Sequence, residues 1–202
     1  MGISRTRSGR HWSESLPAES KLRVSSDQDT MLVDVGGGIG HDLIAFRKVH
    51  PSSSLPGKLV VQDIPAVIDT IDPSTLPSDI QAMKHDFFSP QPIRGAKAYY
   101  LSNVLHDWPD KQALMILRQI VQAMSPESMV LINENCLPDI CVSTYSACAD
   151  LNMMTGFGAL ERTEEQFRAL LDEAGLELVK AWVPVDVADG DGRRLLEAVL
   201  KK

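Results

Sequence analysis

A glycine-rich segment that directly follows a short apolar run constrains the fold of this chain most strongly. Met31–Val35 is apolar apart from one acidic residue, and Asp34–Gly40 reads Asp-Val-Gly-Gly-Gly-Ile-Gly. Glycine allows a tight turn and a close approach of the backbone to a ligand, because it has no Cβ. In an open α/β sheet such a loop lies at the carboxyl end of the first strand, where nucleotide-like ligands bind. The segment therefore predicts a cofactor loop, with a tight turn that holds no ligand as the alternative.

The spacing of the glycines narrows the class of cofactor. A dinucleotide fingerprint has the form G-x-G-x-x-G. Here the third glycine, Gly40, comes one residue earlier. This spacing disfavours a nicotinamide-dependent dehydrogenase and favours a cofactor that has no pyrophosphate.

Apolar runs and amphipathic segments alternate along the chain. Short apolar runs bounded by turn residues are typical of buried parallel strands, and periodic apolar positions indicate helices. The expected strands are 31–35, 59–61, a third that ends at residues 85–88, 98–101, 129–132, 176–183 and 194–200, and the expected helices are 41–49, 111–124 and 164–174. Thr163–Gln166 matches a capping box, Gly175 is the expected helix stop, and Gly190–Gly192 is the expected turn of a closing hairpin. The order predicts an α/β fold with a Rossmann-like, doubly wound, mostly parallel sheet and a C-terminal antiparallel hairpin strand.

The domain organisation follows from length and local composition. The 202 residues fit one domain. Residues 31–202 are expected to form that domain. Residues 1–30 are rich in Ser, Arg, Glu and Asp, and they are expected to be a flexible lead with a short helix near residues 12–22.

Charge and cysteine usage exclude several classes of partner and site. The net charge is −7 and there is no basic run, so a nucleic-acid partner is disfavoured. No apolar run reaches about 18 residues, and the N-terminus lacks the apolar centre of a secretory signal, so no membrane association is expected. The three cysteines, Cys136, Cys141 and Cys148, have no metal-ligand spacing. A cytoplasmic protein with no metal site is the expectation.

Acidic residues follow the second and third expected strands. At the end of the second strand, Asp63 is placed to accept hydrogen bonds from ribose hydroxyls, with a helix cap as the alternative. After the third strand, Asp86 is placed to accept from an adenine amino group, and Phe87 to cover the ring. A loop carboxylate beside a core aromatic side chain is the alternative for that pair.

A family resemblance rests on an ordered set of motifs. The fourth expected strand leads into Leu105-His-Asp-Trp108, and the further motifs are Asp63-Ile-Pro65, Asp86-Phe-Phe88, Glu134-Asn-Cys-Leu-Pro138 and Glu161-Arg-Thr163. Together with the glycine loop, they resemble the C-terminal catalytic domain of the plant and fungal caffeate-type O-methyltransferases, which depend on S-adenosylmethionine and need no metal. The resemblance runs from about residue 31 to the C-terminus. It implies methyl transfer to a hydroxyl group of a small aromatic or polyketide-like compound in secondary metabolism.

The resemblance also implies roles for individual residues. His106 resembles the general base that deprotonates the acceptor hydroxyl, and Glu134 and Glu161 resemble the acidic residues that orient it. A capping or core histidine is the alternative for His106. Asp150 and Met153 resemble residues that line the substrate pocket. The residues implied in cofactor binding are Asp34, Gly36, Gly37, Gly38, Asp63, Asp86, Phe87, Ser102 and Trp108.

Two departures from the family pattern leave other functions open. Ser102 stands where many members have Lys or Arg. About thirty residues precede the glycine loop, too few for the family's N-terminal helical domain, so a homodimer or a partner chain is expected to replace that domain. The alternatives to O-methylation are a degenerate methyltransferase-like subunit and an enzyme that uses the cofactor to promote rearrangement or cyclisation without methyl transfer.

Overall fold

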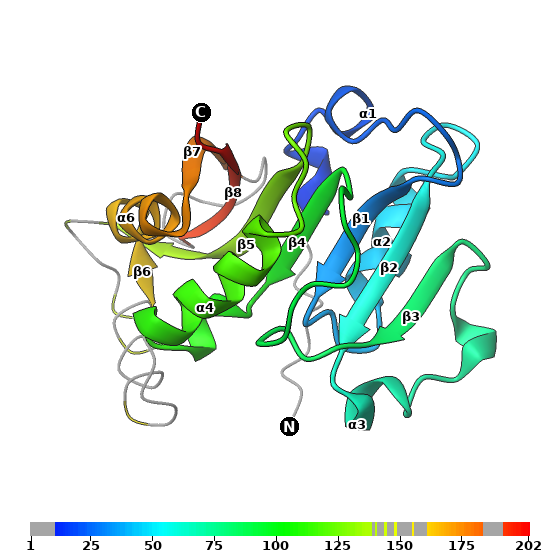
Figure 1. Ribbon diagram of the computed structural model, residues 1–202, viewed down its shortest axis with the longest axis horizontal. Helices are drawn as coiled ribbons and strands as arrows, with labels where there is room; N and C mark the ends of the chain where they lie inside the picture. The colour runs from blue at the N-terminus through cyan, green and yellow to red at the C-terminus, as the bar shows by residue number, and fades with distance from the viewer. Residues whose placement is uncertain are drawn as a thin grey trace.

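The computed structural model describes residues 11–138, 140, 144, 148, 155, 161–183 and 192–202. These residues form a sheet with helices on both faces (Figure 1). The strands are β1 (Thr30–Val35), β2 (Lys58–Asp63), β3 (Ile80–Lys84), β4 (Ala98–Ser102), β5 (Met129–Leu137), β6 (Arg162–Thr163), β7 (Leu176–Trp182) and β8 (Arg193–Leu200). The α-helices are α1 (Ala18–Lys21), α2 (His41–Val49), α3 (Pro65–Ile68), α4 (Asp110–Val121) and α6 (Glu164–Ala174), and the 3-10 turns are η1 (Trp12–Glu14), η2 (Pro73–Thr75) and η3 (Leu105–Asp107).

The sheet has the predicted doubly wound topology. Its strand order is β3-β2-β1-β4-β5-β8-β7, with β6 paired to β5. Strands β1 to β5 are parallel, whereas β8 runs antiparallel to both β5 and β7. This confirms the antiparallel C-terminal hairpin. The strand order reverses between β1 and β4, and in such sheets the ligand crevice lies at the carboxyl ends of the strands beside that point.

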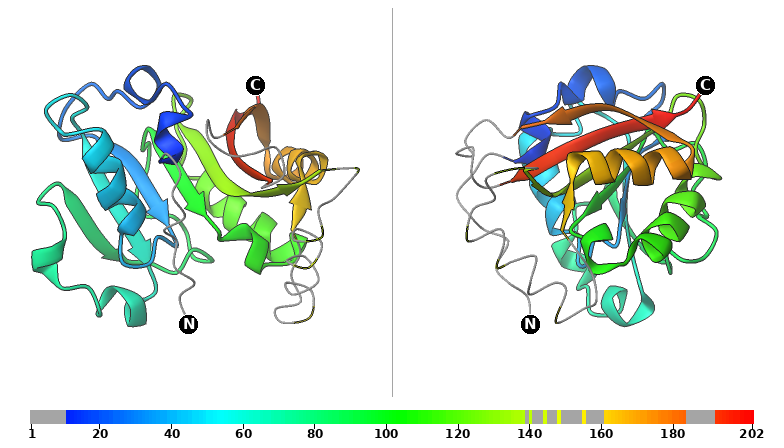
Figure 2. Two further views of the ribbon diagram at one scale, coloured as in Figure 1. Left: turned by 180° about the vertical axis from the view of Figure 1, so that it is seen from behind. Right: turned by 90° about the vertical axis from the view of Figure 1, so that its left-hand side faces the viewer.

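The core forms two layers, one on each face of the sheet. Successive side chains of a strand point to opposite faces. Tyr99 accordingly packs with α4 and α6, while Tyr100 packs with α2 and the N-terminal segment. Figure 2 shows α4 and α6 on one face of the sheet and α2 on the other. The two layers fix the strand ends that carry the candidate site.

Local sequence signals determine several of these elements. Helix α2 spans the predicted residues. The predicted capping box is present, since Thr163 and Gln166 exchange side-chain and backbone hydrogen bonds at the start of α6. Gly175 ends that helix in the left-handed region, with φ of 89°. The first N–H groups of a helix lack partners within it, and this box satisfies two of them, those of Thr163 and Gln166.

The described part of the N-terminal lead is folded. Trp12, Leu16 and Leu22 are buried in the core layer beneath α2. The Trp12 ring stacks on Tyr100, with 4.4 Å between the ring centroids. The prediction of a flexible lead is therefore wrong for residues 11–22, because widely spaced apolar side chains gain enough burial to order a polar segment. The short helix expected there is present as η1 and α1. In the described part of the chain, no helix is long and apolar enough to cross a membrane.

Candidate active site

The glycine loop turns over the end of β1 and is held by β2. The N–H groups of Gly36 and Gly37 both donate to the carbonyl oxygen of Gln62, at 2.9 and 3.0 Å. A Cβ on Gly37 would lie 2.4 Å from the Asp34 carboxylate, so only glycine fits there. Gly38 has a φ of 62°, and a Cβ there would meet nothing within 4 Å. The loop is therefore packed on its inner side at Gly37 and open on its outer side at Gly38.

Asp63 links the end of β2 to the glycine loop. Its Oδ2 accepts from the Gly38 N–H at 2.8 Å, and its Oδ1 accepts from the Ile64 N–H at 2.8 Å. A carboxylate has about four lone-pair positions. Helix α3 has Ile64 as its N-cap and no side-chain cap, so Asp63 does not cap it as the alternative interpretation expected, and its carboxylate keeps acceptor capacity for hydroxyl groups of a ligand. Ile64, which the sequence interpretation did not single out, is 46% exposed beside it.

Two residues predicted to contact the cofactor lie beneath the surface of the crevice. The side chain of Asp34 is buried, and its carboxylate lies 2.4 Å from the position of a Cβ on Gly37. Ser102 is buried, and its side chain hydrogen-bonds to Tyr100. The structure does not present Ser102 at the rim, because alternate residues of β4 point to the α2 face.

Aromatic side chains stand beside the glycine loop. The ring of Phe87 lies 3.5 Å from the position of a Gly36 Cβ. Trp108 packs edge-on against Phe87 and Phe88, with ring centroids 6.0 and 4.8 Å apart. Asp86, which is exposed, accepts from the Phe88 N–H at 2.9 Å. The predicted adenine-side residues are thus brought together, in a group that also includes Phe88.

His106 lies in the turn η3 that follows β4. Val104, at the start of this turn, approaches the glycine loop, since its Cγ2 is 3.0 Å from the position of a Gly36 Cβ. The His106 side chain is 20% exposed, and its Nδ1 is 3.3 Å from Oε1 of Glu161. Its Nε2 is 3.4 Å from Oδ1 of Asp107. The imidazole is therefore partly exposed and has an acidic group near each of its nitrogens.

Glu134 supports the same turn from beneath. Its Oε1 accepts from the N–H groups of Val104 and Leu105, at 2.9 and 2.6 Å. The residue is 1% exposed. Burial raises the pKa of the Glu134 carboxyl, and the charge of His106, these two hydrogen bonds and Arg162 offset only part of that rise. The sequence resemblance placed His106, Glu134 and Glu161 in one site, and the structure brings these three residues together.

The surroundings of His106 favour the protonated ring. Burial by itself lowers the pKa of the imidazole, but the hydrogen bond to Glu161 and the charges of Glu134, Asp107 and Glu161 outweigh it. The net pKa is raised above the ordinary value of 6.5. Such an environment stabilises the imidazolium that forms when the ring takes a proton.

Arg162 is a site residue that the sequence interpretation missed. It was quoted only as the middle residue of a motif, yet it is 1% exposed and makes hydrogen bonds to the backbone on both sides of His106. The available signal in the sequence was the position of Arg162 directly after the predicted catalytic Glu161. Long charged side chains are seldom buried without partners, so an arginine there indicates a candidate site residue. The partners themselves lie more than fifty residues away in the sequence.

The predicted substrate-pocket residues lie outside the described part of the chain. Asp150 and Met153, the predicted substrate residues, are not among the described residues. Across the described ranges there is no cluster of His, Cys, Asp or Glu that could hold a metal ion.

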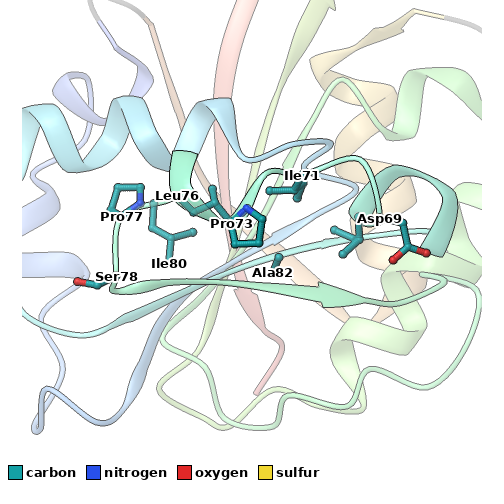
Figure 3. A pocket seen from close by; sticks show the side chains of 9 residues that line it. Asp69, Ile71, Pro73, Leu76, Pro77, Ser78, Ile80 and Ala82 are labelled. Atoms are coloured by element: carbon teal, nitrogen blue, oxygen red, sulfur yellow. The ribbon is translucent and has the colours of Figure 1, made fainter.

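An apolar pocket lies elsewhere in the fold, under the segment that joins β2 to β3. Its volume is about 440 Å³, and Figure 3 shows Ile71, Pro73 and Leu76 around it above the edge strand β3. None of the predicted site residues lines this pocket. The candidate active site is therefore the group of residues at the carboxyl ends of the parallel strands, which the glycine loop, Asp63 and His106 define.

Comparison with known proteins agrees with this geometry. The family model of the O-methyltransferase domain matches residues 12–177. The chain is 41% identical over 172 residues to the demethylsterigmatocystin 6-O-methyltransferase stcP of Emericella nidulans, covering 85% of this chain and 82% of that protein. It is 40% identical over 192 residues to the demethylsterigmatocystin 6-O-methyltransferase of Aspergillus flavus, covering 95% of this chain and 47% of that protein.

Solved structures share the fold. LepI in complex with S-adenosylmethionine superposes with a TM-score of 0.88 at 33% identity, covering 98% of this chain and 50% of LepI. OxaC has a TM-score of 0.82 at 36% identity, covering 93% of this chain and 47% of OxaC. The chain thus spans about half the length of most of these proteins. With a family model that matches most of its length and relatives at about 40% identity, the chain belongs to the O-methyltransferase family.

Proposed function

We propose that this chain forms the S-adenosylmethionine-binding catalytic domain of an O-methyltransferase that acts on a small aromatic or polyketide-like hydroxyl compound in secondary metabolism. The observation that carries the proposal is the position of His106, 3.3 Å from Glu161 and in the turn that touches the glycine loop. The demethylsterigmatocystin 6-O-methyltransferases, and the structure of OxaC with S-adenosylhomocysteine and oxaline, support the class of acceptor.

The residues at the strand ends fit S-adenosylmethionine. The loop at Gly36–Gly38 is open on its outer side, and Asp63 keeps acceptor capacity for the ribose hydroxyls. Asp86 and the ring of Phe87 stand where the adenine would follow, with Trp108 packed against that ring. When bound, S-adenosylmethionine supplies an electrophilic methyl group.

His106 would act as the general base. With its proton on Nδ1 and directed at Glu161, the neutral ring has its lone pair on Nε2, and the acceptor hydroxyl would have to reach that nitrogen beside the Asp107 carboxylate, whose Oδ1 is 3.4 Å away. As the ring takes that proton it becomes cationic, and the carboxylates of Glu161 and Glu134 stabilise the charge. In-line attack requires that the acceptor oxygen be held in line with the bond between the methyl carbon and sulfur. The rigidity of the turn that carries His106 therefore matters as much as the basicity of the imidazole.

Replacement of His106 tests the assignment. We expect His106→Ala and His106→Gln to lower methyl transfer to a panel of phenols by at least about 100-fold, the usual contribution of a general base. Binding of S-adenosylhomocysteine, measured by calorimetry, should change by less than about twofold, because the glycine loop and Asp63 are untouched. Full activity in either variant would remove His106 from the mechanism.

A cofactor-assisted rearrangement or cyclisation is the second candidate. It is favoured by the similarity to a structure described as a pericyclic reaction enzyme, with a TM-score of 0.88 at 33% identity. Mass spectrometry of products discriminates between the two. A gain of one methyl group supports methyl transfer, whereas an isomer of unchanged mass supports rearrangement. A degenerate subunit would show neither product and no binding of S-adenosylmethionine at millimolar concentration.

We also propose where the remaining substrate contacts arise. Asp150 and Met153 are assigned to the substrate pocket on the resemblance alone. A second copy of the chain or a partner chain is proposed to contribute further contacts to that pocket. Light scattering with and without the acceptor would report such an assembly. A cytoplasmic location stays a prediction.

A further inference from the structure

We propose that Arg162 is a positioning residue for His106, because its guanidinium group fastens the turn that carries the imidazole. This inference rests on the proposed role of His106 as general base. Arg162 itself touches neither nitrogen of that ring, so it would act through the backbone.

The guanidinium group is bonded to both ends of the turn. Nη1 donates to the carbonyl oxygen of Leu105 at 2.8 Å, and Nη2 donates to that of Trp108 at 2.7 Å. Nε donates to Oδ1 of Asp110 at 3.0 Å, at the start of α4. The two carbonyl groups belong to the residue before His106 and to the second residue after it. The imidazole therefore projects from a backbone loop that is closed by one side chain.

The burial of this cation is costly unless its hydrogen bonds are satisfied. Arg162 is 1% exposed, and its guanidinium lies 5.8 Å from the centroid of the Phe167 ring. A buried charge must recover its lost hydration through well-placed partners. The planar fork of arginine bonds several acceptors at once in fixed directions, whereas the ammonium of lysine is a single point. The partners found are concentrated on the His106 turn, so the fork specifies the geometry of that turn.

The same backbone segment also delivers the carboxylate that faces His106. Glu161 immediately precedes Arg162, and Arg162 pairs with Cys136 on β5, two residues after Glu134. The segment thus joins the turn, the carboxylate of Glu161 and the strand that carries Glu134. Displacement of the turn by about 1 Å would remove the contact between His106 and Glu161, and an error of this size in catalytic geometry costs about 100-fold in rate.

The charge-conserving variant Arg162→Lys separates geometry from electrostatics. Arg47→Lys is the matched control, because Arg47 is another buried arginine that bonds backbone carbonyl groups, those of Leu55 and Gly57, away from the site. The primary readout is the titration of the His106 ring by NMR, assigned among the five histidines with His106→Gln. Calorimetry with S-adenosylhomocysteine and the rate of methyl transfer complete the set.

We expect Arg162→Lys to lower the His106 titration midpoint by at least about 0.5 pH unit, because the contact with Glu161 loosens. The kcat should fall at least tenfold, with S-adenosylhomocysteine affinity within about twofold. Arg47→Lys should leave all three unchanged. A wild-type midpoint in Arg162→Lys, or an equal shift in Arg47→Lys, would overturn the proposal.

A second variant tests whether Arg162 positions His106 if Arg162→Lys does not fold. The Asp110 side chain is 72% exposed, so Asp110→Ala removes one anchor of the guanidinium without opening the core. We expect a smaller shift of the His106 midpoint in the same direction, and no shift would overturn the proposal. The titration needs no cofactor, so failure of the wild-type chain to bind S-adenosylhomocysteine would defeat the proposed function separately.

Discussion

At the scale of single residues, His106 is defined by its neighbours. A histidine followed by Asp-Trp does not by itself indicate a catalytic role. His106, however, faces Glu161 and lies in a turn whose backbone N–H groups donate to Glu134. The three residues come from β5, from η3 and from the position directly before β6, so their proximity depends on the sheet. The motifs identified the residues, and the strand order explains why they meet.

The raised pKa of His106 predicts the pH dependence of the reaction. Only the neutral ring accepts a proton, so kcat/KM should rise with pH through the pKa of His106 in the free enzyme. That pKa lies above 6.5, so the midpoint of the acid limb should lie above pH 6.5. A rate profile of methyl transfer from pH 5 to 9 measures it. A limb centred at or below pH 6 would mean that the carboxylates do not act on the ring.

Glu161→Gln isolates the contribution of charge. The amide keeps the size of the side chain and an acceptor oxygen but removes the negative charge that raises the pKa of His106. We expect the acid limb to move to lower pH and kcat to fall about 10- to 100-fold, because the imidazolium loses a partner. Glu164→Gln, on the exposed first turn of α6, is the control and should leave the profile unchanged.

At the scale of elements, local signals predicted boundaries and missed long-range contacts. Helix α2 and the capping box of α6 follow from apolar spacing and cap residues, which act within a few positions. The lead at residues 11–22 was expected to be flexible because its composition is polar. Its order comes from Trp12 against Tyr100, a contact across almost ninety residues that local composition does not contain. The hydrogen bonds from Arg162 to the His106 turn were missed for the same reason, because their partners lie more than fifty residues away in the sequence.

Trp12→Ala tests whether the lead belongs to the folded domain. The ring is 7% exposed and lies between Tyr100 and Phe46, with centroids 4.4 and 5.7 Å away. Loss of a buried tryptophan costs about 3–5 kcal/mol, a large share of a typical domain's stability. Urea unfolding followed by circular dichroism measures the difference. Glu19→Ala, exposed on α1, should cost less than about 0.5 kcal/mol. Equal midpoints for the two variants would show that the lead is not packed in solution.

At the scale of the whole molecule, the predicted cofactor residues gather at one edge of one sheet. Asp63 ends β2, and the glycine loop, Asp86 and His106 follow β1, β3 and β4 respectively, on both sides of the point where the strand order reverses. This grouping of the cofactor residues was predictable from the sequence, because parallel strands place their carboxyl ends at the same edge of a sheet. The substrate side was not, since Asp150 and Met153 were assigned on the family resemblance alone and are not among the described residues.

Ligand-induced stabilisation tests whether this edge binds S-adenosylhomocysteine in the chain as it stands. A ligand that binds only the folded state at 100 times its Kd adds about 2.7 kcal/mol to the free energy of unfolding. We expect a rise in the thermal midpoint that saturates with S-adenosylhomocysteine, and none with NAD, whose pyrophosphate does not suit the glycine spacing. Asp63→Asn should reduce the rise relative to its own ligand-free midpoint, because one acceptor for the ribose is weakened. Equal stabilisation by both ligands would contradict the cofactor assignment, whereas a rise confined to S-adenosylhomocysteine would place cofactor binding within residues 1–202 alone.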